Sequence, residues 1–473
     1  MTADQQFGTS ITEMLDQAFG LQKKAYIADP MPPMAQRLAW LAALRDMLLN
    51  NKQSIVEAIN QDFGNRAANE TIMAEILPCI KNVDYLRRNL KKWMRPSKRA
   101  VGSLFKPASA KVVYQPLGVV GVIVPWNYPL SLAIVPLATA LAAGNRVMIK
   151  MSERTPNLAS LLKRELAGLF PESLVHVTAG RPGSGTAFAK LPFDHILFTG
   201  STEVGVQVMS SAAANLTPVT LELGGKSPAI VSPSVPVAHA AERIAYGKAL
   251  NAGQTCIAPD YALVPNNRID EFVEQYKSAV ERFYPSMDGN PDYTSIIADR
   301  EIDRLSAYLD DAKSKGAHFI KVHAYSQGKR FPHTLLLRPN DTMKVMQDEI
   351  FGPILPIVGY DTLEQAIEYV NARPRPLALY FFGYDSAEQE RVLYATHSGG
   401  VCINETLMHI AQEDLPFGGV GPSGMGRYHG HEGFLTFSNA KGVFVRGRFN
   451  GSKPAYPPYG SKTQKVIQWL HVR

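Results

Sequence analysis

One cysteine of the chain lies in a sequence that suits a reactive thiol. Cys256 stands in NAGQTCIAPD, where Gly253 and the polar residues around it predict an exposed turn. On such a turn a thiol can meet a substrate, and backbone N–H donors can lower its pKa from about 8.5. Cys79, in EILPCIKNV, and Cys402, in GGVCIN, are instead typical of packing on an apolar helix face and in a strand. Cys256 is therefore the candidate nucleophile.

Two polar residues could complete the chemistry of such a thiol. Glu222 ends the apolar run of VTLELGGKSP, where its carboxylate either reaches solvent or is desolvated and acts as a base near neutral pH. Asn127, in VPWNYP, either forms a turn or supplies a side-chain amide that stabilises an oxyanion. The sequence thus contains candidates for a nucleophile, a base and an oxyanion donor.

A second group of residues suits the binding of a phosphorylated cofactor. HILFTGSTEVG predicts a strand, then Gly200, then a helix capped by Ser201 or Thr202. The free amides of that helix could bind a pyrophosphate, although any α/β crossover can contain such a turn. After the predicted strand RVMIK, Lys150 and Glu153 could hold ribose hydroxyls or simply face solvent.

The elements that must position these residues alternate between strands and helices. Helical periodicity dominates the chain up to about residue 93, and from residue 117 short apolar runs alternate with helical patterns. This alternation predicts an α/β fold with a parallel, doubly wound sheet, and a second α/β region from about residue 230. Residues 117–144 carry no charge and could span a membrane by length alone. Their prolines and Asn127 favour a buried strand and helix instead.

Length, composition and charge exclude several classes of protein. With 473 residues, 45% hydrophobic and 19% charged, the chain is expected to form two to three globular domains. Three cysteines exclude a disulfide scaffold and indicate a reducing compartment. The first ten residues contain no secretory signal or membrane anchor. The net charge of +7 arises partly from residues 81–99, whose helical spacing favours a solvated helix face over nucleic-acid binding.

Several of these motifs, in their order and spacing, resemble the aldehyde dehydrogenase superfamily. The motifs are VPWNYP, IKMSE, FTGSTEVG, LELGGKSP, GQTC and EIFGP, and the resemblance extends from about Ala35 to Phe444. RPLALYFFGYD and the long segment that begins GGVCINETLMHI resemble the class 3 branch of that superfamily, and within it the bacterial coniferyl aldehyde dehydrogenases.

This resemblance implies a role for each candidate residue. Cys256 would attack the aldehyde, Asn127 and the Cys256 amide would hold the oxyanion, and Glu222 would activate the water that hydrolyses the thioester. A nicotinamide cofactor would contact Trp126, Lys150, Glu153, Gly200, Ser201, Val204, Glu349 and Phe351. Where the family usually has Lys-Pro-Ser-Glu, this chain has Met151 as the second residue. Glu153 would repel a 2′-phosphate, so NAD is expected, with NADP possible and no metal.

The resemblance also implies a domain organisation and partners. A Rossmann-type NAD(P)-binding domain would comprise residues 1–100 and 117–226, and an α/β catalytic domain residues 227–429. Residues 101–116 and 430–473 would form a small β extension for oligomerisation, with strands near 430–446 and a surface tail. A cytoplasmic homodimer is expected, without nucleic-acid or membrane partners.

The substrate is the least determined property. Aromatic aldehydes such as coniferyl aldehyde are expected, while a medium- or long-chain aliphatic aldehyde dehydrogenase and a catalytically silent binding protein remain alternatives. Four residues could line an aromatic pocket or belong to the core: Tyr380, Phe382, His409 and Phe417.

Overall fold

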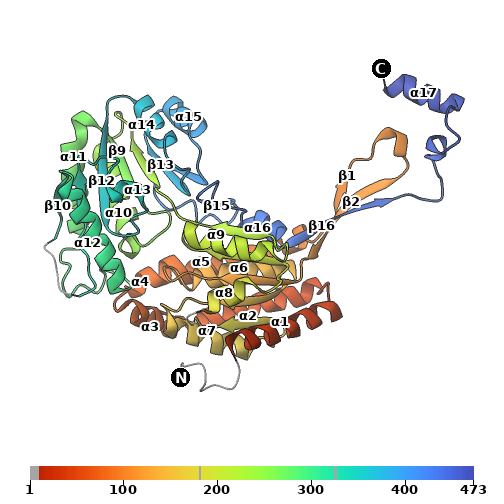
Figure 1. Ribbon diagram of the computed structural model, residues 1–473, viewed down its shortest axis with the longest axis horizontal. Helices are drawn as coiled ribbons and strands as arrows, with labels where there is room; N and C mark the ends of the chain where they lie inside the picture. Colours follow the sequence, from red (N-terminus) through yellow and green to blue (C-terminus); the bar gives the residue numbers. More distant parts are fainter. Residues whose placement is uncertain (1–9, 181–182, 324–327, 473) are drawn as a thin grey trace.

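The protein consists of two α/β lobes and a projecting arm (Figure 1). The computed structural model describes residues 10–180, 183–323 and 328–472. The expectation that the chain starts without a signal or anchor rests largely on residues 1–9, which lie outside the described residues.

The first lobe is built on a six-stranded sheet with the strand order β15-β7-β6-β3-β4-β5. Its strands are β3 (Val119–Ile123), β4 (Arg146–Lys150), β5 (Val175–Thr178), β6 (His195–Thr199), β7 (Val219–Glu222) and β15 (Gly424–Met425). All are parallel except β15, which pairs antiparallel with β7. The order of the five parallel strands reverses between β3 and β6, which is the doubly wound arrangement predicted from the alternating pattern.

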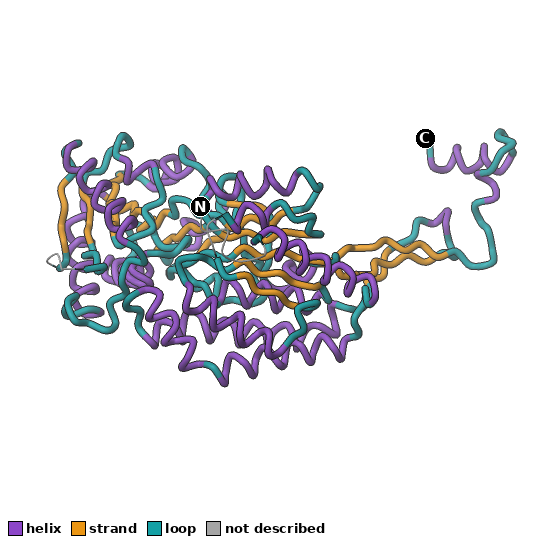
Figure 2. The backbone as a smooth tube through the Cα atoms, turned by 60° about the horizontal axis from the view of Figure 1, so that its bottom comes forward, coloured by secondary structure: helices purple, strands orange, loops and turns teal. Residues whose placement is uncertain are grey.

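Helices cover both faces of this sheet, as Figure 2 shows. The N-terminal helices are α1 (Ile11–Ala28), α2 (Met34–Asn50), α3 (Lys52–Phe63), α4 (Ala68–Thr71), a π-helical turn (Ile72–Ile76) and α5 (Leu77–Trp93). The crossover helices are α6 (Ser131–Ala143), α7 (Pro156–Leu169), α8 (Ser184–Ala189) and α9 (Thr202–Ala213). The uncharged stretch 117–144 forms β3 and α6, and α6 is buried along most of its length. No described helix is both long and apolar enough to cross a membrane.

The second lobe contains a seven-stranded sheet with the order β10-β11-β12-β9-β8-β13-β14. Its strands are β8 (Pro228–Val231), β9 (Tyr261–Pro265), β10 (His318–Lys321), β11 (Thr334–Leu337), β12 (Ile354–Tyr360), β13 (Ala378–Phe382) and β14 (Gly400–Ile403), and only the edge strand β10 is antiparallel within these described strands. The helices are α10 (Val237–Ala249), α11 (Ile269–Phe283), α12 (Asp299–Ser314), α13 (Lys344–Gln347), α14 (Leu363–Asn371) and α15 (Ser386–Ala395). The predicted second α/β region is therefore confirmed.

The arm is a three-stranded antiparallel sheet that extends away from both lobes (Figure 1). It comprises β1 (Ser97–Arg99), β2 (Ser109–Pro116) and β16 (Ser438–Val445). It therefore begins at Ser97, a few residues before the expected extension. The strands expected near 430–446 occur only in part, because residues 430–436 form the helix α16 (Gly430–Thr436). The tail contains an unpredicted helix, α17 (Lys462–His471), which has no buried residue.

Candidate active site

The predicted site residues meet in one cleft at the reversal point of the first sheet. In doubly wound sheets ligands bind beyond the carboxyl ends of the strands at such a point. The cleft has a volume of about 1090 Å³ and takes residues from both lobes. It is lined by all of the predicted site residues: Asn127, Glu222, Cys256, Trp126, Lys150, Glu153, Gly200, Ser201, Val204, Glu349 and Phe351.

Cys256 is carried by a tightly bent loop between α10 and β9. Asn251 and Ala252, just before it, have left-handed backbone angles (φ of 53° and 52°), as does Gly253 (φ of 73°). Side chains other than glycine rarely adopt this conformation, so surrounding contacts must hold the loop. A Cβ atom at position 253 would lie 2.5 Å from the carbonyl oxygen of Gly352, which explains the glycine there.

The electrostatic environment of the thiol differs from the expectation. Although Cys256 is only partly covered, burial, together with the carboxylates of Glu349 and Glu222, raises the pKa of its thiol to about 12. The expectation of a net lowering of this pKa is therefore wrong, and so is the expected exposed turn, because residues 251–255 are all buried. Backbone amides do act in the predicted direction, but desolvation and two nearby carboxylates outweigh them.

Glu222 ends β7 and is 3% exposed, so its carboxylate does not simply reach solvent. Neither of its carboxyl oxygens has a hydrogen-bond partner among the described residues. Desolvation raises its pKa well above the usual value, and Arg427 opposes this shift only in part. An unpaired carboxyl group with a raised pKa, facing the same cleft as a thiol, has the properties of a general base.

Asn127 follows β3 and is 4% exposed. Its side-chain Nδ2 donates to the carbonyl of Gln254 at 3.2 Å, which places the amide against the loop that carries Cys256. An amide nitrogen has two hydrogens, so one N–H remains for a developing oxyanion. Asn127 is thus more than a turn former.

The turn after β6 presents a helix N-terminus to the cleft. Ser201 is the N-cap of α9, and its hydroxyl accepts a hydrogen bond from the amide of Val204 at 3.4 Å. The amide of Gly200 donates to the carbonyl of Glu222 at 3.0 Å, which joins this turn to the strand of the candidate base. The remaining free amides at the start of α9 suit an anionic group such as a pyrophosphate.

Lys150 and Glu153 lie together at the end of β4. The Lys150 ammonium contacts a carboxylate oxygen of Glu153 at 3.2 Å, and the Glu153 side chain is 54% exposed. Partial burial opposes ionisation of Glu153, but its own backbone amide and Lys150 together hold its pKa below the usual value. Glu153 therefore presents a negative charge at the rim of the cleft.

Glu349 and Phe351 approach the cleft from the second lobe. A Cβ atom at Gly224 would lie 2.0 Å from a carboxylate oxygen of Glu349, so only glycine permits this approach. The Oε1 atom of Glu349 is buried without a hydrogen-bond partner among the described residues. Phe351 has a φ of 49° and packs edge to face on Trp126, with ring centroids 5.3 Å apart. An unsatisfied acceptor beside a helix N-terminus fits a nicotinamide dinucleotide, which offers ribose hydroxyls and phosphates.

Two cationic residues that were not among the predicted site residues also shape this cleft. Lys226 donates to the carbonyls of Val345 and Asp348 at 2.7 and 3.0 Å and pairs with Asp260 at 2.5 Å. Arg304 donates to the carbonyl of Ile350 at 2.9 Å. Both therefore fix the segment that carries Glu349. The LELGGKSP motif contained Lys226, but nothing local to the sequence indicated its distant partners.

Among residues 10–180, 183–323 and 328–472, no group of three or more His, Cys, Asp or Glu side chains could hold a metal ion.

Comparisons with known proteins agree with this geometry. The sequence pattern of the "Aldehyde dehydrogenase family" matches residues 9–443. The chain is 62% identical to a "Probable coniferyl aldehyde dehydrogenase" of Pseudomonas aeruginosa over 97% of its length and 96% of that protein. It is 45% identical to a "Coniferyl aldehyde dehydrogenase" of Pseudomonas sp. over 97% of this chain and 96% of that protein.

Solved structures give the same result. The structure described as "Substrate bound state of Staphylococcus Aureus AldH" matches with a TM-score of 0.92 and 36% identity, covering 96% of this chain and 99% of that one. An indole-3-acetaldehyde dehydrogenase of P. syringae in complex with NAD+ matches with a TM-score of 0.85 and 25% identity, covering 92% and 89%. The fold, the cleft and these matches together show that the chain belongs to the aldehyde dehydrogenase family and is an NAD(P)-dependent oxidoreductase.

Proposed function

We propose that the chain oxidises aromatic aldehydes such as coniferyl aldehyde to carboxylic acids, with Cys256 as nucleophile, Glu222 as base and Asn127 as oxyanion donor. The observation that carries this proposal is the single cleft that contains all three residues beside a helix N-terminus. A silent binding protein would have no use for an unpaired carboxyl group and a thiol facing the same cleft. The family assignment also favours an enzyme over such a binding protein.

The proposed reaction has two halves. Sγ of Cys256 forms a bond to the aldehyde carbon as its S–H proton is released to water, and the carbonyl oxygen becomes an oxyanion held by Asn127 and the Cys256 amide. A bound nicotinamide would supply the acceptor for the hydride of that carbon, which leaves a thioester on Cys256. In the second half, Glu222 takes a proton from water, which attacks the thioester. The C–S bond then breaks, the carboxylic acid leaves, and the proton held by Glu222 passes to the sulfur and restores the thiol.

The names of similar proteins support an aromatic substrate. The similar proteins from two Pseudomonas strains are named for coniferyl aldehyde. The hydroxyl of Tyr380 donates to the carbonyl of Ile257, next to the nucleophile, at 2.5 Å. From Tyr380 an aromatic cluster continues to His409, at 6.1 Å between ring centroids, and then to Phe417 at 6.0 Å. Neither ring nitrogen of His409 has a hydrogen-bond partner among the described residues. None of these three rings lines the cleft, however, and Tyr380 and Phe417 are buried, so the cluster packs in the core beside the loop that carries Cys256.

Kinetics with different aldehydes test this substrate class. We expect kcat/KM for coniferyl aldehyde and other aromatic aldehydes to exceed that for medium-chain aliphatic aldehydes by about tenfold or more, because ring contacts contribute beyond area burial. The measurement is initial NADH formation at saturating NAD. A tenfold preference for the aliphatic substrates would favour the aliphatic alternative instead.

Glu153 is proposed to make NAD the preferred cofactor. Its carboxylate at the rim of the cleft would repel the 2′-phosphate of NADP, whereas it can accept hydrogen bonds from the ribose hydroxyl groups of NAD. We expect Glu153→Gln to raise kcat/KM for NADP relative to NAD by about 5- to 50-fold. Parallel titrations of both cofactors check this, with Glu172→Gln, at a glutamate outside the cleft, as the control. An unchanged cofactor ratio in Glu153→Gln would contradict the proposal.

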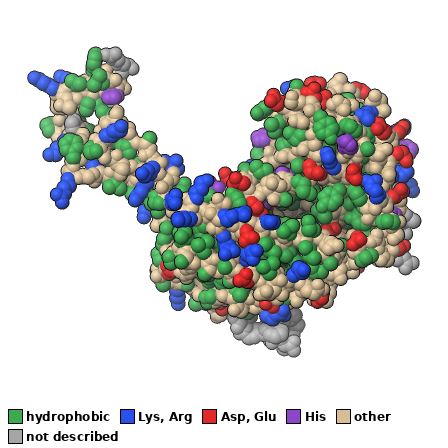
Figure 3. Space-filling view, turned by 180° about the vertical axis from the view of Figure 1, so that it is seen from behind, with side chains coloured by type: hydrophobic (Ala, Val, Ile, Leu, Met, Phe, Trp, Pro, Cys, Tyr) green, Lys and Arg blue, Asp and Glu red, His purple; other side chains and the backbone are tan. Residues whose placement is uncertain are grey.

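The arm is proposed to serve a homodimer, as the family resemblance implies. The arm exposes Phe105, in the short turn between β1 and β2, and Phe444 of β16, which contact each other edge to face and are 49% and 54% exposed. Figure 3 shows Lys and Arg side chains gathered along the arm. A cytoplasmic location is supported by chemistry, because Cys79, Cys256 and Cys402 are all free and oxidation of Cys256 would stop the reaction.

A further inference from the structure

A buried ion cluster lies directly behind the oxyanion donor. Arg66, between α3 and α4, contacts Glu70 at 3.2 Å and Glu75 at 2.8 Å. The side chains of Arg66 and Glu75 are 0% exposed and that of Glu70 is 8% exposed. Burying such ions is costly, and apolar residues of similar size often serve stability as well or better. The cluster therefore calls for an explanation other than stability.

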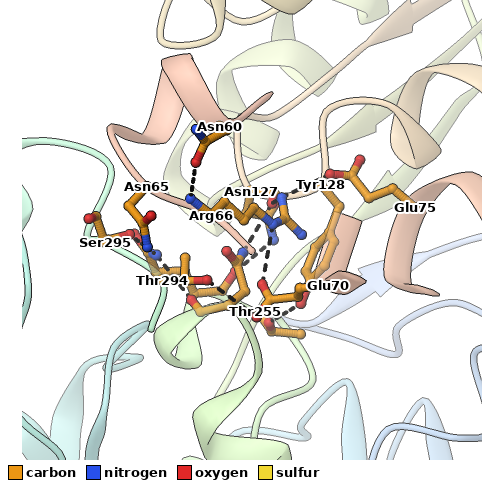
Figure 4. Close-up of polar contacts among 12 residues, drawn as sticks. Asn60, Asn65, Arg66, Glu70, Glu75, Asn127, Tyr128, Thr255, Thr294 and Ser295 are labelled. Atoms are coloured by element: carbon orange, nitrogen blue, oxygen red, sulfur yellow. Dashed lines mark hydrogen bonds and ion pairs between the residues drawn. The ribbon is translucent and has the colours of Figure 1, made fainter. Parts of the chain in front are cut away.

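The contacts of Arg66 lead to the residue that faces the aldehyde. Its Nη1 donates to the backbone carbonyl of Asn127 at 3.1 Å, and Nδ2 of Asn251 donates to the same oxygen at 3.0 Å. Both acceptor positions of that carbonyl are thus occupied, which fixes the peptide plane after Asn127. Figure 4 shows Arg66 between Asn127, Glu70 and Glu75.

The same cluster is joined to the neighbouring peptide units on both sides. Glu75 accepts hydrogen bonds from the amides of Leu130 and Ser131 at 2.7 and 3.1 Å, just after the Asn127 turn. The guanidinium of Arg66 lies over the ring of Tyr128, 4.8 Å from its centroid. The Tyr128 hydroxyl and the hydroxyl of Thr255, which precedes Cys256, are 2.7 Å apart. Arg66 thus contacts Asn127 at its backbone carbonyl and Tyr128 at its ring. Each of these two residues is in turn hydrogen-bonded to the loop that carries Cys256, called here the nucleophile loop.

We propose that Arg66, held by Glu70 and Glu75, is a positioning residue that orients the Asn127 amide toward the oxyanion formed at Cys256. This inference rests on the proposed role of Asn127, and Arg66 acts only through that residue. Orientation errors of about 1 Å near a reacting atom can cost on the order of 10²-fold in rate. Lysine cannot reproduce the fork of a guanidinium, so Arg66→Lys keeps the charge but releases at least one of these contacts.

The test measures the first-order rate constant of the first turnover, with cofactor and aldehyde saturating. This constant does not depend on the fraction of folded enzyme, so a merely structural role would leave it unchanged. We expect Arg66→Lys to lower it by about 10- to 100-fold. In an Asn127→Ala background the same substitution should lower it by less than about threefold, because the route through Asn127 is already lost. NAD affinity, measured by fluorescence titration, should change little.

Arg37 offers a matched control. It is also buried, at 1% exposed, and its Nη1 donates to the carbonyls of Ala142 and Ala143 at the far end of α6. Arg37→Lys should lower the melting temperature without changing the first-turnover constant. An equal loss of rate in Arg37→Lys would overturn the proposal, as would full additivity of Arg66→Lys with Asn127→Ala. A full rate in Asn127→Ala alone would overturn the oxyanion role and the proposal with it.

A second variant keeps the test decisive if Arg66→Lys does not fold. Tyr128→Phe removes only the hydroxyl that meets Thr255 and disturbs no buried charge. We expect a first-turnover constant about 3- to 10-fold lower than that of the unaltered enzyme, again with little further loss in the Asn127→Ala background. An unchanged constant in Tyr128→Phe would overturn the linkage between the Asn127 turn and the nucleophile loop.

Discussion

Cys256→Ala is expected to lower kcat for aldehyde oxidation by about 10⁵-fold or more, because the covalent route disappears with the nucleophile. The cofactor should still bind, since the α9 N-terminus and Glu349 are untouched. Steady-state NADH formation and a fluorescence titration with NAD measure the two properties separately. Retention of more than about one per cent of the activity would mean that another group attacks the aldehyde.

Cys402→Ala is the matched control for this substitution. Cys402 is free and partly exposed like Cys256, but it lies in β14 and does not line the cleft. Its removal should leave kcat unchanged.

The thiol of Cys256 also predicts a pH dependence. Because burial raises its pKa to about 12, the thiolate fraction of the cofactor-free enzyme rises about tenfold per pH unit over the whole neutral range. Alkylation of the cofactor-free enzyme by iodoacetamide should follow this slope.

Glu222→Gln is expected to separate the two halves of the reaction. Acylation by Cys256 remains, so one rapid burst of NADH close to one per active site should appear. Hydrolysis of the thioester loses its base, so the steady-state rate that follows should fall by about 10²- to 10⁴-fold. Stopped-flow NADH absorbance records both phases. Loss of the burst along with the steady state would instead place Glu222 in the first half.

The pH profile gives a second test of Glu222. Desolvation raises its pKa well above 4.5, and only the carboxylate form can accept a proton from water. The steady-state rate should therefore rise with pH through this raised pKa and be lost below it, and this limb should vanish in Glu222→Gln. Glu413→Gln is the control, because burial raises the pKa of Glu413 to about 7 although it does not line the cleft. This variant should retain the limb.

Local chemistry made part of the site predictable. The N-cap at Ser201 follows from one strand, one glycine and one small polar residue, and the structure confirms it. The alternation of apolar runs was enough to predict both α/β lobes, and the prolines and Asn127 within residues 117–144 were enough to predict a buried strand and helix there. These features depend on neighbours within a few residues, which is the range over which sequence patterns carry structural information.

The parts that could not be predicted depend on distant neighbours. The raised pKa of Cys256 comes from burial and from charges that include Glu349, which lies far from Cys256 along the chain, just before β12. Arg66 reaches Asn127 across 61 positions of the chain. β15 turns back to pair with Glu222 although its own two residues carry no strand pattern. Helix α17 was missed because its polar spacing resembles a solvated tail, and it has no buried residue.

The register of the arm has a consequence for how the chain folds. The β2–β16 ladder pairs Pro116 with Ser438 and Ser109 with Val445, so about two thirds of the chain separates the two strands in sequence. During synthesis one edge of β2 stays unpaired until its partner strand β16, near the C-terminal end, has been made. The unpaired edge carries charge of one sign. Lys111 lies on this strand, and Asp84 is the one acidic residue between Glu75 and Glu153. Like charges disfavour pairing between the β2 edges of two nascent chains, so the basic charge of the arm reduces mispairing before β16 is made.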